Sequence, residues 1–225
     1  MRDISSYIDH TLLKPVCSFN EIERTCEEAL HYKFAAVCIP PIAVRQAKQS
    51  TNGSMVKVAT VIGFPFGYEV VKAKQTETEQ AIIDGADELD IVINLIALKS
   101  GSWSYLENEM KALIDLAHVH HKLVKVIIES GLLTDSEIVH CCQLYSELGA
   151  DFLKTSTGYA EKGASIEAVR LMHDNLPPSV RIKASGGIRT YDFACQLIEA
   201  GASRLGCSAS VAIVKNAMEE QKHDY

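Results

Sequence analysis

Eight short apolar segments rich in β-branched residues alternate with longer amphipathic segments along the 225 residues of the chain. The apolar segments predict strands at 7–11, 34–39, 56–62, 88–94, 123–129, 151–155, 180–185 and 203–206. Apolar spacing of about 3.6 residues predicts helices between them, most clearly at 20–32, 70–84, 105–121, 135–148 and 191–200. Strands that alternate with helices in this way predict a parallel α/β fold.

The number of units favours a closed barrel. Eight strands in 225 residues give about 28 residues per unit, close to the roughly 30 residues of a βαβ unit. We therefore expect residues 1–225 to form a single TIM (β/α)8 barrel domain. An open doubly wound sheet is the alternative, but neither of the glycine-rich phosphate motifs, GxGxxG and GxxxxGK[ST], occurs.

Composition and charge exclude several functional classes. With 47% hydrophobic residues and a net charge of −7, we expect a globular protein that does not bind nucleic acid. Seven irregularly spaced cysteines argue against a disulfide framework and for a reducing compartment. An apolar leader and an apolar run of about 18 residues are both missing, so we expect a cytoplasmic protein without a membrane partner.

Strand periodicity places charged residues inside this barrel. In segment 180–185 the apolar Val180, Ile182 and Ala184 share one face, so Arg181 and Lys183 share the other, inner face. The same alternation directs further polar side chains of the other strands inward, namely Asp90, Lys125, Glu129 and Lys154. Burial of unpaired charges costs several kcal/mol, so these residues form either a structural salt-bridge network or a catalytic site.

Lys154 and Lys183 favour the catalytic alternative. Both lie at carboxyl ends of predicted strands, where the active sites of TIM barrels occur, and their spacing places them on adjacent strands. Like charge and low dielectric both lower the pKa of a lysine, and a neutral lysine can form a Schiff base with a carbonyl. Asp90 faces the same cavity and is a candidate general acid and base.

Two neighbouring loops predict a phosphate site. The segment after the seventh strand contains Gly186 and Gly187 before a helix, and the segment after the eighth strand contains Ser208. Glycines allow backbone N–H groups to approach an anion, and a helix N-terminus adds a favourable dipole. TIM barrels often bind phosphate with these two loops, although ordinary tight turns would contain the same glycines.

Several motifs resemble those of deoxyribose-phosphate aldolases. They are IDHTLLKP at 8–15, VATVIGFP at 58–65, ELDIVIN at 88–94, FLKTSTG at 152–158 and IKASGGIR at 182–189. The resemblance runs in order through nearly the whole chain. It implies a TIM barrel and a metal-independent class I aldolase, which reversibly cleaves 2-deoxyribose 5-phosphate to glyceraldehyde 3-phosphate and acetaldehyde.

The resemblance also implies roles for individual residues. Lys154 would form the Schiff base, Lys183 would perturb its pKa, and Asp90 would relay protons. The resemblance implies substrate-binding positions at Asp9, Thr11, Gly158, Gly186, Gly187 and Ser208. Some relatives use a C-terminal tyrosine for proton transfer, so Tyr225 is a further candidate. Pro40, Ala209 and the segment 159–163 depart from the usual pattern.

The expected partners are therefore small molecules, a phosphosugar and an aldehyde, with no metal or organic cofactor. We also expect a homodimer or another homo-oligomer. Two other functions remain open at this stage. One is a different imine-forming enzyme of phosphosugars, similar to a transaldolase, and the other is a catalytically silent phosphate-binding barrel.

Overall fold

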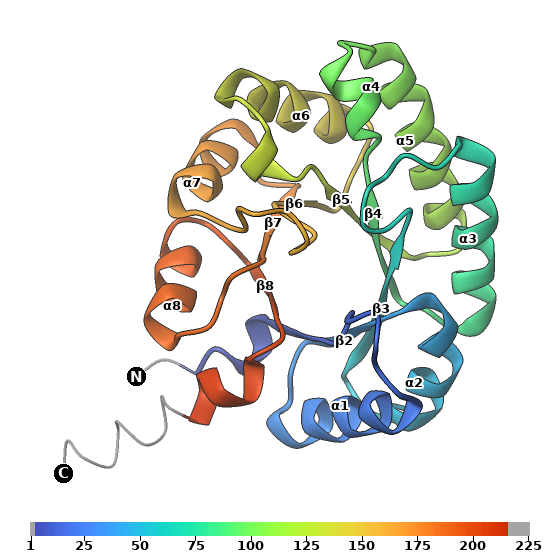
Figure 1. Cartoon of the computed structure of the whole chain (residues 1–225), viewed down its shortest axis with the longest axis vertical. Helices are drawn as coiled ribbons and strands as arrows, with labels where there is room; N and C mark the ends of the chain where they lie inside the picture. The colour runs from blue at the N-terminus through green and yellow to red at the C-terminus, as the bar shows by residue number, and fades with distance from the viewer. Residues whose placement is uncertain (1–2, 216–225) are drawn as a thin grey trace.

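The computed structural model describes residues 3–215, which contain one closed parallel barrel in which each strand pairs with the next and β8 pairs with β1. The strands are β1 Ile8–Thr11, β2 Ala36–Ile39, β3 Lys57–Ile62, β4 Glu88–Val92, β5 Leu123–Ile127, β6 Phe152–Lys154, β7 Arg181–Ser185 and β8 Arg204–Cys207. Figure 1 shows these strands as a central ring surrounded by helices. The predicted TIM barrel is confirmed, and the assignment of all 225 residues to one domain stays a prediction.

The helices that cover the barrel are α1 Phe19–Tyr32, α2 Val44–Ser50, α3 Val71–Asp84, α4 Leu95–Lys99, α5 Trp103–Val119, α6 Asp135–Glu147, α7 Ile166–Asn175 and α8 Tyr191–Glu199. Three 3-10 helices add Ser5–Tyr7, Pro41–Ala43 and Ser130–Leu132, and a further helical turn begins at Ser210. The five helices predicted from apolar spacing are confirmed to within two residues. None of the described helices is long and apolar enough to cross a membrane.

Local sequence signals define where the helices begin. At α1, the Ser18 side chain accepts from the Glu21 N–H while the Glu21 carboxylate accepts from the Ser18 N–H. Thr134 and Glu137 form the same reciprocal cap at α6. Such caps satisfy backbone donors that a helix leaves free and contribute about 1 kcal/mol each. They fix the positions at which the loops from the strand ends enter the helices.

Two of the strands end two residues earlier than their apolar patterns suggest. β4 stops at Val92 because Asn94 caps α4, where its side chain accepts from the Ala97 N–H. β5 stops at Ile127, and Glu129 takes a left-handed backbone conformation with φ 53°. Both segments remain buried although they have left the ladder, which explains why they resemble strand in sequence.

The barrel packs two different cores. Apolar side chains on the outer faces of the strands pack against the helices and form the large core. A small apolar cluster lies inside, from β2 and β3, and consists of Ala36, Cys38, Ala59 and Val61. These short side chains leave interior volume that the long lysines of β5, β6 and β7 can fill, as close packing requires.

The loop 63–70 after β3 is fastened to the end of β4. The buried Lys74 ammonium donates to the Val92 carbonyl (2.8 Å) and to Glu109 (2.9 Å), and Glu77 accepts from the Gly63 N–H (2.7 Å). Gly67 lies so close to the chain that an added Cβ would stand 1.9 Å from the Ile93 carbonyl oxygen. The ends of β3 and β4 thus form one rigid part of the barrel mouth.

This close approach predicts the effect of two matched substitutions. Gly67 and Gly53 both have positive φ, 69° and 74°, but a Cβ on Gly53 meets open space. Gly53→Ala should lower the free energy of unfolding by about 1 kcal/mol through backbone strain, and Gly67→Ala by about 3 kcal/mol because it adds a collision with the backbone. Urea unfolding monitored by circular dichroism measures both, and equal losses would contradict the packing described for Gly67.

Candidate active site

One carboxylate, that of Asp90 on β4, lies at the centre of the barrel interior. Its Oδ1 accepts from the Lys125 ammonium at 2.6 Å. Its Oδ2 accepts from Lys154 at 2.8 Å and from Lys183 at 2.6 Å. All four side chains are nearly or fully buried. Lys154 and Lys183 are direct register partners on β6 and β7, as the sequence spacing predicts.

A second group of charges lies next to Asp90. Asp9 on β1 accepts from Lys183 at 2.5 Å and from Arg204 at 2.6 Å. Glu88, two residues before Asp90 on β4, pairs with Lys125 at 2.6 Å and with Arg204 at 3.1 Å. The interior ion pairs therefore join three carboxylates to four cationic side chains. If all seven groups were ionised, the cluster would carry one uncompensated positive charge.

Lys154 is the member of this cluster with the weakest compensation. Lys125 and Lys183 each contact two carboxylates within 2.6 Å, whereas Asp90 is the only ion-pair partner of Lys154 in the described part of the chain. Lys154 is also the one of these three lysines that lines the adjoining pocket. The geometry thus selects Lys154 as the lysine that can be neutral and can reach a ligand.

The electrostatics of the two register partners differ in direction. Burial lowers the pKa of Lys154; Asp90 partly opposes this shift, and the nearby charge of Lys183 adds to it. Burial would also lower the pKa of Lys183, but the carboxylates of Asp9 and Asp90 outweigh it and raise that pKa. The pKa of Asp90 is held well below its usual range because three lysines outweigh the effect of its burial. Lys183 therefore stays charged beside a lysine that loses its proton easily.

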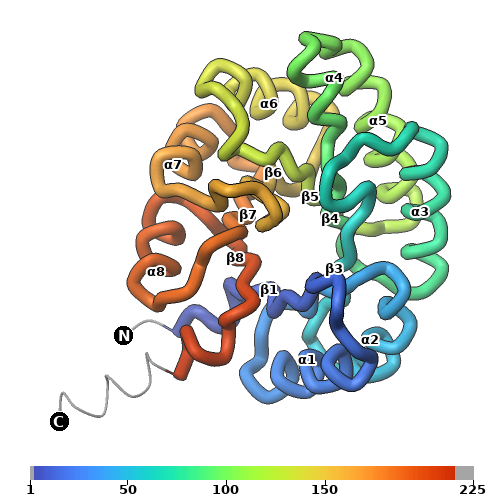
Figure 2. Tube along the Cα trace, in the orientation of Figure 1, coloured from blue at the N-terminus to red at the C-terminus, as the bar shows by residue number. Residues whose placement is uncertain are grey.

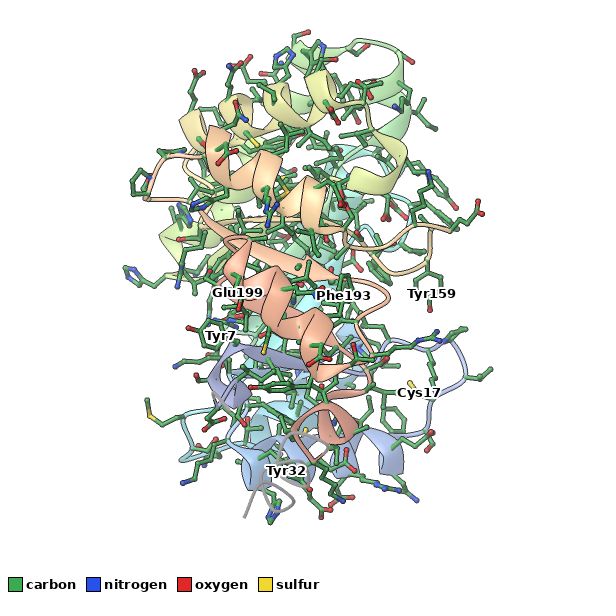
Figure 3. The ribbon with its side chains drawn as sticks, turned by 90° about the vertical axis from the view of Figure 1, so that its left-hand side faces the viewer. Tyr7, Cys17, Tyr32, Tyr159, Phe193 and Glu199 are labelled. Carbon is green, nitrogen blue, oxygen red and sulfur yellow. The ribbon has the colours of Figure 1, made fainter. Side chains whose placement is uncertain are left out.

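A pocket of about 290 Å³ opens above Lys154, lined by the loops at the carboxyl ends of β1, β6, β7 and β8. Five predicted substrate-binding residues line it together with Lys154: Thr11, Gly158, Gly186, Gly187 and Ser208. Figure 3 views the molecule from the side, with Tyr159 of this pocket on the same side as Phe193 near the start of α8 and opposite Glu199 at its end. The pocket therefore lies on the face of the barrel where active sites of this fold occur.

Glycines bring two of the pocket loops into backbone contact. The Ala164 N–H donates to the carbonyls of Ser185 and Gly186. A Cβ on Gly163 would stand 2.3 Å from the Gly186 oxygen, so no larger residue fits there without a shift. Gly186 itself has φ 87°, a conformation that favours glycine. The cradle formed by Gly158, Gly186 and Gly187 is therefore a property of both loops together.

The remaining predicted residues lie in different places. Asp9 is buried beneath the pocket in the ion-pair cluster and is not among the residues that line the pocket. Tyr225 lies outside the described residues. Glu129 is buried, but its carboxylate accepts from the Thr157 N–H and hydroxyl, where it supports the loop after β6. Arg181, the first residue of β7, is exposed, and its guanidinium covers the Phe152 ring.

Two members of the cluster, Glu88 and Arg204, were absent from the sequence-based prediction. The same alternation could have found them, because Glu88 precedes Asp90 by two residues and Arg204 precedes the pocket residue Gly206 by two. Within the described residues, groups of three or more His, Cys, Asp and Glu side chains that could hold a metal ion do not occur.

Comparison with known proteins identifies the family. Residues 4–216 match the DeoC/LacD family of aldolases. The chain belongs to this aldolase family. The deoxyribose-phosphate aldolase of Streptococcus gordonii is 50% identical over 212 residues, which cover 94% of this chain and 96% of the relative. That of Thermococcus gammatolerans is 48% identical and covers 96% of both chains. The resemblance seen in the sequence motifs is thereby confirmed.

Solved structures agree with this assignment. A putative deoxyribose-phosphate aldolase from Coccidioides immitis superposes with a TM-score of 0.92 at 41% identity, covering 96% of this chain and 86% of that one. The tetrameric deoxyribose phosphate aldolase from Aeropyrum pernix superposes with a TM-score of 0.89 at 30% identity, covering 96% and 91%.

The cluster predicts a pH effect of Lys183→Leu. Loss of the Lys183 charge removes repulsion from Lys154 and leaves Asp90 with fewer competing donors, so the pKa of Lys154 should rise. Since the neutral amine is the reactive form, the ascending limb of the pH profile for Schiff-base formation should move to higher pH. The rate of borohydride-trapped adduct formation with acetaldehyde measures this limb.

Lys57→Leu, at the exposed first residue of β3, is the control and should leave the limb in place. Lys183→Arg keeps the positive charge and should move the limb less than Lys183→Leu. Circular dichroism verifies that each variant is folded. A folded Lys183→Leu protein whose limb coincides with that of the wild type would refute the electrostatic coupling.

Proposed function

We propose that this protein is a deoxyribose-phosphate aldolase, which reversibly cleaves 2-deoxy-D-ribose 5-phosphate to D-glyceraldehyde 3-phosphate and acetaldehyde. One observation carries the proposal. The amine of Lys154 faces a pocket with a glycine-rich cradle, has a single carboxylate partner among residues 3–215 and lies beside a lysine that stays charged. The relatives that bear this name match nearly the whole chain.

In the proposed reaction the neutral Lys154 amine attacks C1 of the open-chain sugar. The carbinolamine nitrogen then passes its extra proton to Asp90, whose Oδ2 lies 2.8 Å from Lys154 Nζ. The carbinolamine hydroxyl takes up a proton and leaves as water, which forms the iminium ion. Lys183 also donates to Asp90 Oδ2 and holds this carboxylate next to the reacting nitrogen.

Cleavage follows because the iminium nitrogen withdraws electrons. The C3 hydroxyl passes its proton through a water molecule to the Asp90 carboxylate, the C2–C3 bond breaks, and the electron pair of that bond forms the enamine of acetaldehyde. Glyceraldehyde 3-phosphate departs. C2 then takes up a proton, and water releases acetaldehyde and restores Lys154. Asp90 is fully buried beneath Lys154, so we assign it to proton transfer through the Lys154 nitrogen or a water molecule rather than to direct contact with C3.

The phosphate end of the substrate would occupy the cradle of Gly158, Gly186 and Gly187, with Ser208 from the neighbouring loop. Thr190 caps α8 three residues after Gly187, so the positive end of the α8 dipole lies close to this cradle. Thr11 lies on the β1 side of the pocket and Asp9 below it, where Asp9 holds Lys183. We also propose that Tyr225 takes part in the protonation of C2.

Borohydride trapping tests this proposal. Reduction in the presence of 2-deoxyribose 5-phosphate should leave an irreversible adduct that peptide mass spectrometry finds on Lys154. Lys154→Ala should lose the adduct and lower kcat by a factor of 10⁴ or more, on the order of the loss seen when a covalent nucleophile is removed. Lys162→Ala, on the exposed segment after Gly158, serves as the control and should keep both. Phosphate binding without any adduct on Lys154 would contradict the proposal that the protein is an enzyme.

Activity assays of the purified protein distinguish a deoxyribose-phosphate aldolase from a transaldolase-like enzyme and test whether a metal is needed. A deoxyribose-phosphate aldolase should turn over 2-deoxyribose 5-phosphate much faster than ketose phosphates, whereas a transaldolase-like enzyme would prefer the ketose. Since we assign the electron-withdrawing role to the Lys154 imine, activity should persist after dialysis against EDTA. Loss of activity that Zn²⁺ or Mg²⁺ restores would contradict the metal-independent mechanism.

We also propose that the protein works as a homo-oligomer in the cytoplasm. Exposed apolar side chains gather at the loops after β1 to β3, where Phe19 and Ile42 share one groove and Ile42 and Val70 share the next. A continuous apolar surface of this kind is typical of a subunit interface. The seven cysteines of the chain are all free in the structure, which suits a reducing compartment.

A further inference from the structure

The charge of the candidate pocket differs from that of the whole protein. The chain carries a net charge of −7, yet the described residues that line this pocket include two cations, Lys14 and Arg189, beside the Lys154 amine, and no carboxylate. A cleft lined by one sign of charge concentrates ligands of the opposite sign. This lining therefore favours an anionic ligand, and each of the two cations can contribute to its recognition.

Neither the fold nor the proposed chemistry requires the positive charge of Lys14. Lys14 lies in the loop after β1 and is exposed, and its charge lies near enough to the Glu21 carboxylate to help lower the pKa of that group. Within residues 3–215 it forms no salt bridge and no side-chain hydrogen bond. In the barrel order β6, β7, β8, β1, its loop closes the side of the pocket that lies away from Gly158. Gly186, Gly187 and Ser208 lie between the two sides. Lys14 thus lines the same pocket as the glycine cradle.

Tyr159 fastens the loop that carries Lys14. The Tyr159 hydroxyl donates to the carbonyl of Leu13, the residue next to Lys14, at 2.8 Å. Its ring packs edge-on against Phe64 of the loop 63–70, with the ring centroids 5.4 Å apart. Three loops from separate parts of the barrel mouth therefore meet at one side chain. In Figure 2 the gold segment that follows β6 turns inward over the ring of strands.

The main chain of Tyr159 is itself held from below. Its N–H donates to the Thr157 hydroxyl oxygen, and that hydroxyl donates to the buried Glu129 carboxylate. A continuous series of hydrogen bonds thus runs from Glu129 through Thr157 and Tyr159 to Leu13. This series supports the loop of β1 with the same loop that carries Gly158, so the two sides of the pocket are positioned together.

We propose that Lys14 is a further specificity-determining residue, whose ammonium binds the phosphate group of the substrate from the β1 side of the pocket. Tyr159 is its positioning residue, because it holds Leu13 and thereby Lys14 at the pocket edge. The inference rests on the proposed function in so far as a phosphosugar is the ligand. Lys14 then distinguishes phosphorylated from unphosphorylated sugars, while Lys154 performs the same chemistry on both.

Lys14→Met tests this inference, because methionine keeps an unbranched side chain and removes the charge. Its affinity for inorganic phosphate, titrated by calorimetry, should fall roughly three- to tenfold, the effect expected for one exposed charged hydrogen bond. The ratio of kcat/KM for 2-deoxyribose 5-phosphate to that for 2-deoxyribose should fall by a similar factor, mainly through KM. Lys162→Met is the matched control, an exposed lysine after Gly158 that does not line the pocket, and should keep wild-type values.

Tyr159→Phe tests the positioning role. It removes the hydroxyl that binds Leu13 and keeps the ring on Phe64, so it should lower the same ratio by a smaller factor in the wild type and not at all in Lys14→Met. Wild-type phosphate affinity or a wild-type ratio in Lys14→Met would overturn the role of Lys14. An equal loss from Tyr159→Phe in both backgrounds would overturn the role of Tyr159. If the proposed function is wrong, the wild-type protein will form no adduct on Lys154. The phosphate titration does not depend on that result and still decides whether Lys14 binds phosphate.

Discussion

The site depends on one buried carboxylate that serves three lysines. Asp90 offers Oδ1 to Lys125 and Oδ2 to both Lys154 and Lys183. Removal of one partner from a buried ion pair leaves an uncompensated charge and typically costs about 3–5 kcal/mol. The charged residues of four strands are therefore fixed relative to one another by electrostatics, and the small residues of β2 and β3 provide the space that the lysine stems occupy.

An unequal number of charges makes the cluster reactive rather than merely stable. Three carboxylates oppose four cations, so deprotonation of one lysine leaves the buried cluster neutral. The position of each carboxylate decides which lysine this is. Asp9 and Glu88 lie where they stabilise charge on Lys183, Lys125 and Arg204. In the described part of the chain Lys154 pairs with one carboxylate, which it shares with Lys183. The same ion pairs that stabilise the interior thus favour loss of the proton from the Lys154 amine at the floor of the pocket.

Strand alternation was sufficient to place Asp90, Lys125, Lys154 and Lys183 inside the barrel, because side-chain direction in a strand has a period of two. It could not identify the neutral lysine, since that depends on Asp9, Glu88 and Arg204, which reach the cluster from three other positions in the chain. Alternation also determines on which face of a strand a side chain lies, but not how deeply that side chain is buried. Arg181 shares its strand face with Lys183, yet it is exposed to solvent, whereas Glu88, also the first residue of its strand, is buried.

The pocket above the cluster was predictable only in part, for a related reason. Gly158, Gly186, Gly187 and Ser208 lie directly after strands, so their common position follows from the parallel arrangement of a barrel. The contact between Tyr159 and Leu13 joins residues 146 positions apart in loops of unrelated sequence, and neither residue alone indicates it. In this fold the strands position the groups that do the chemistry, and loop contacts of this kind determine which ligand is preferred. Related barrels can therefore keep a lysine cluster while the residues at their pocket edges differ.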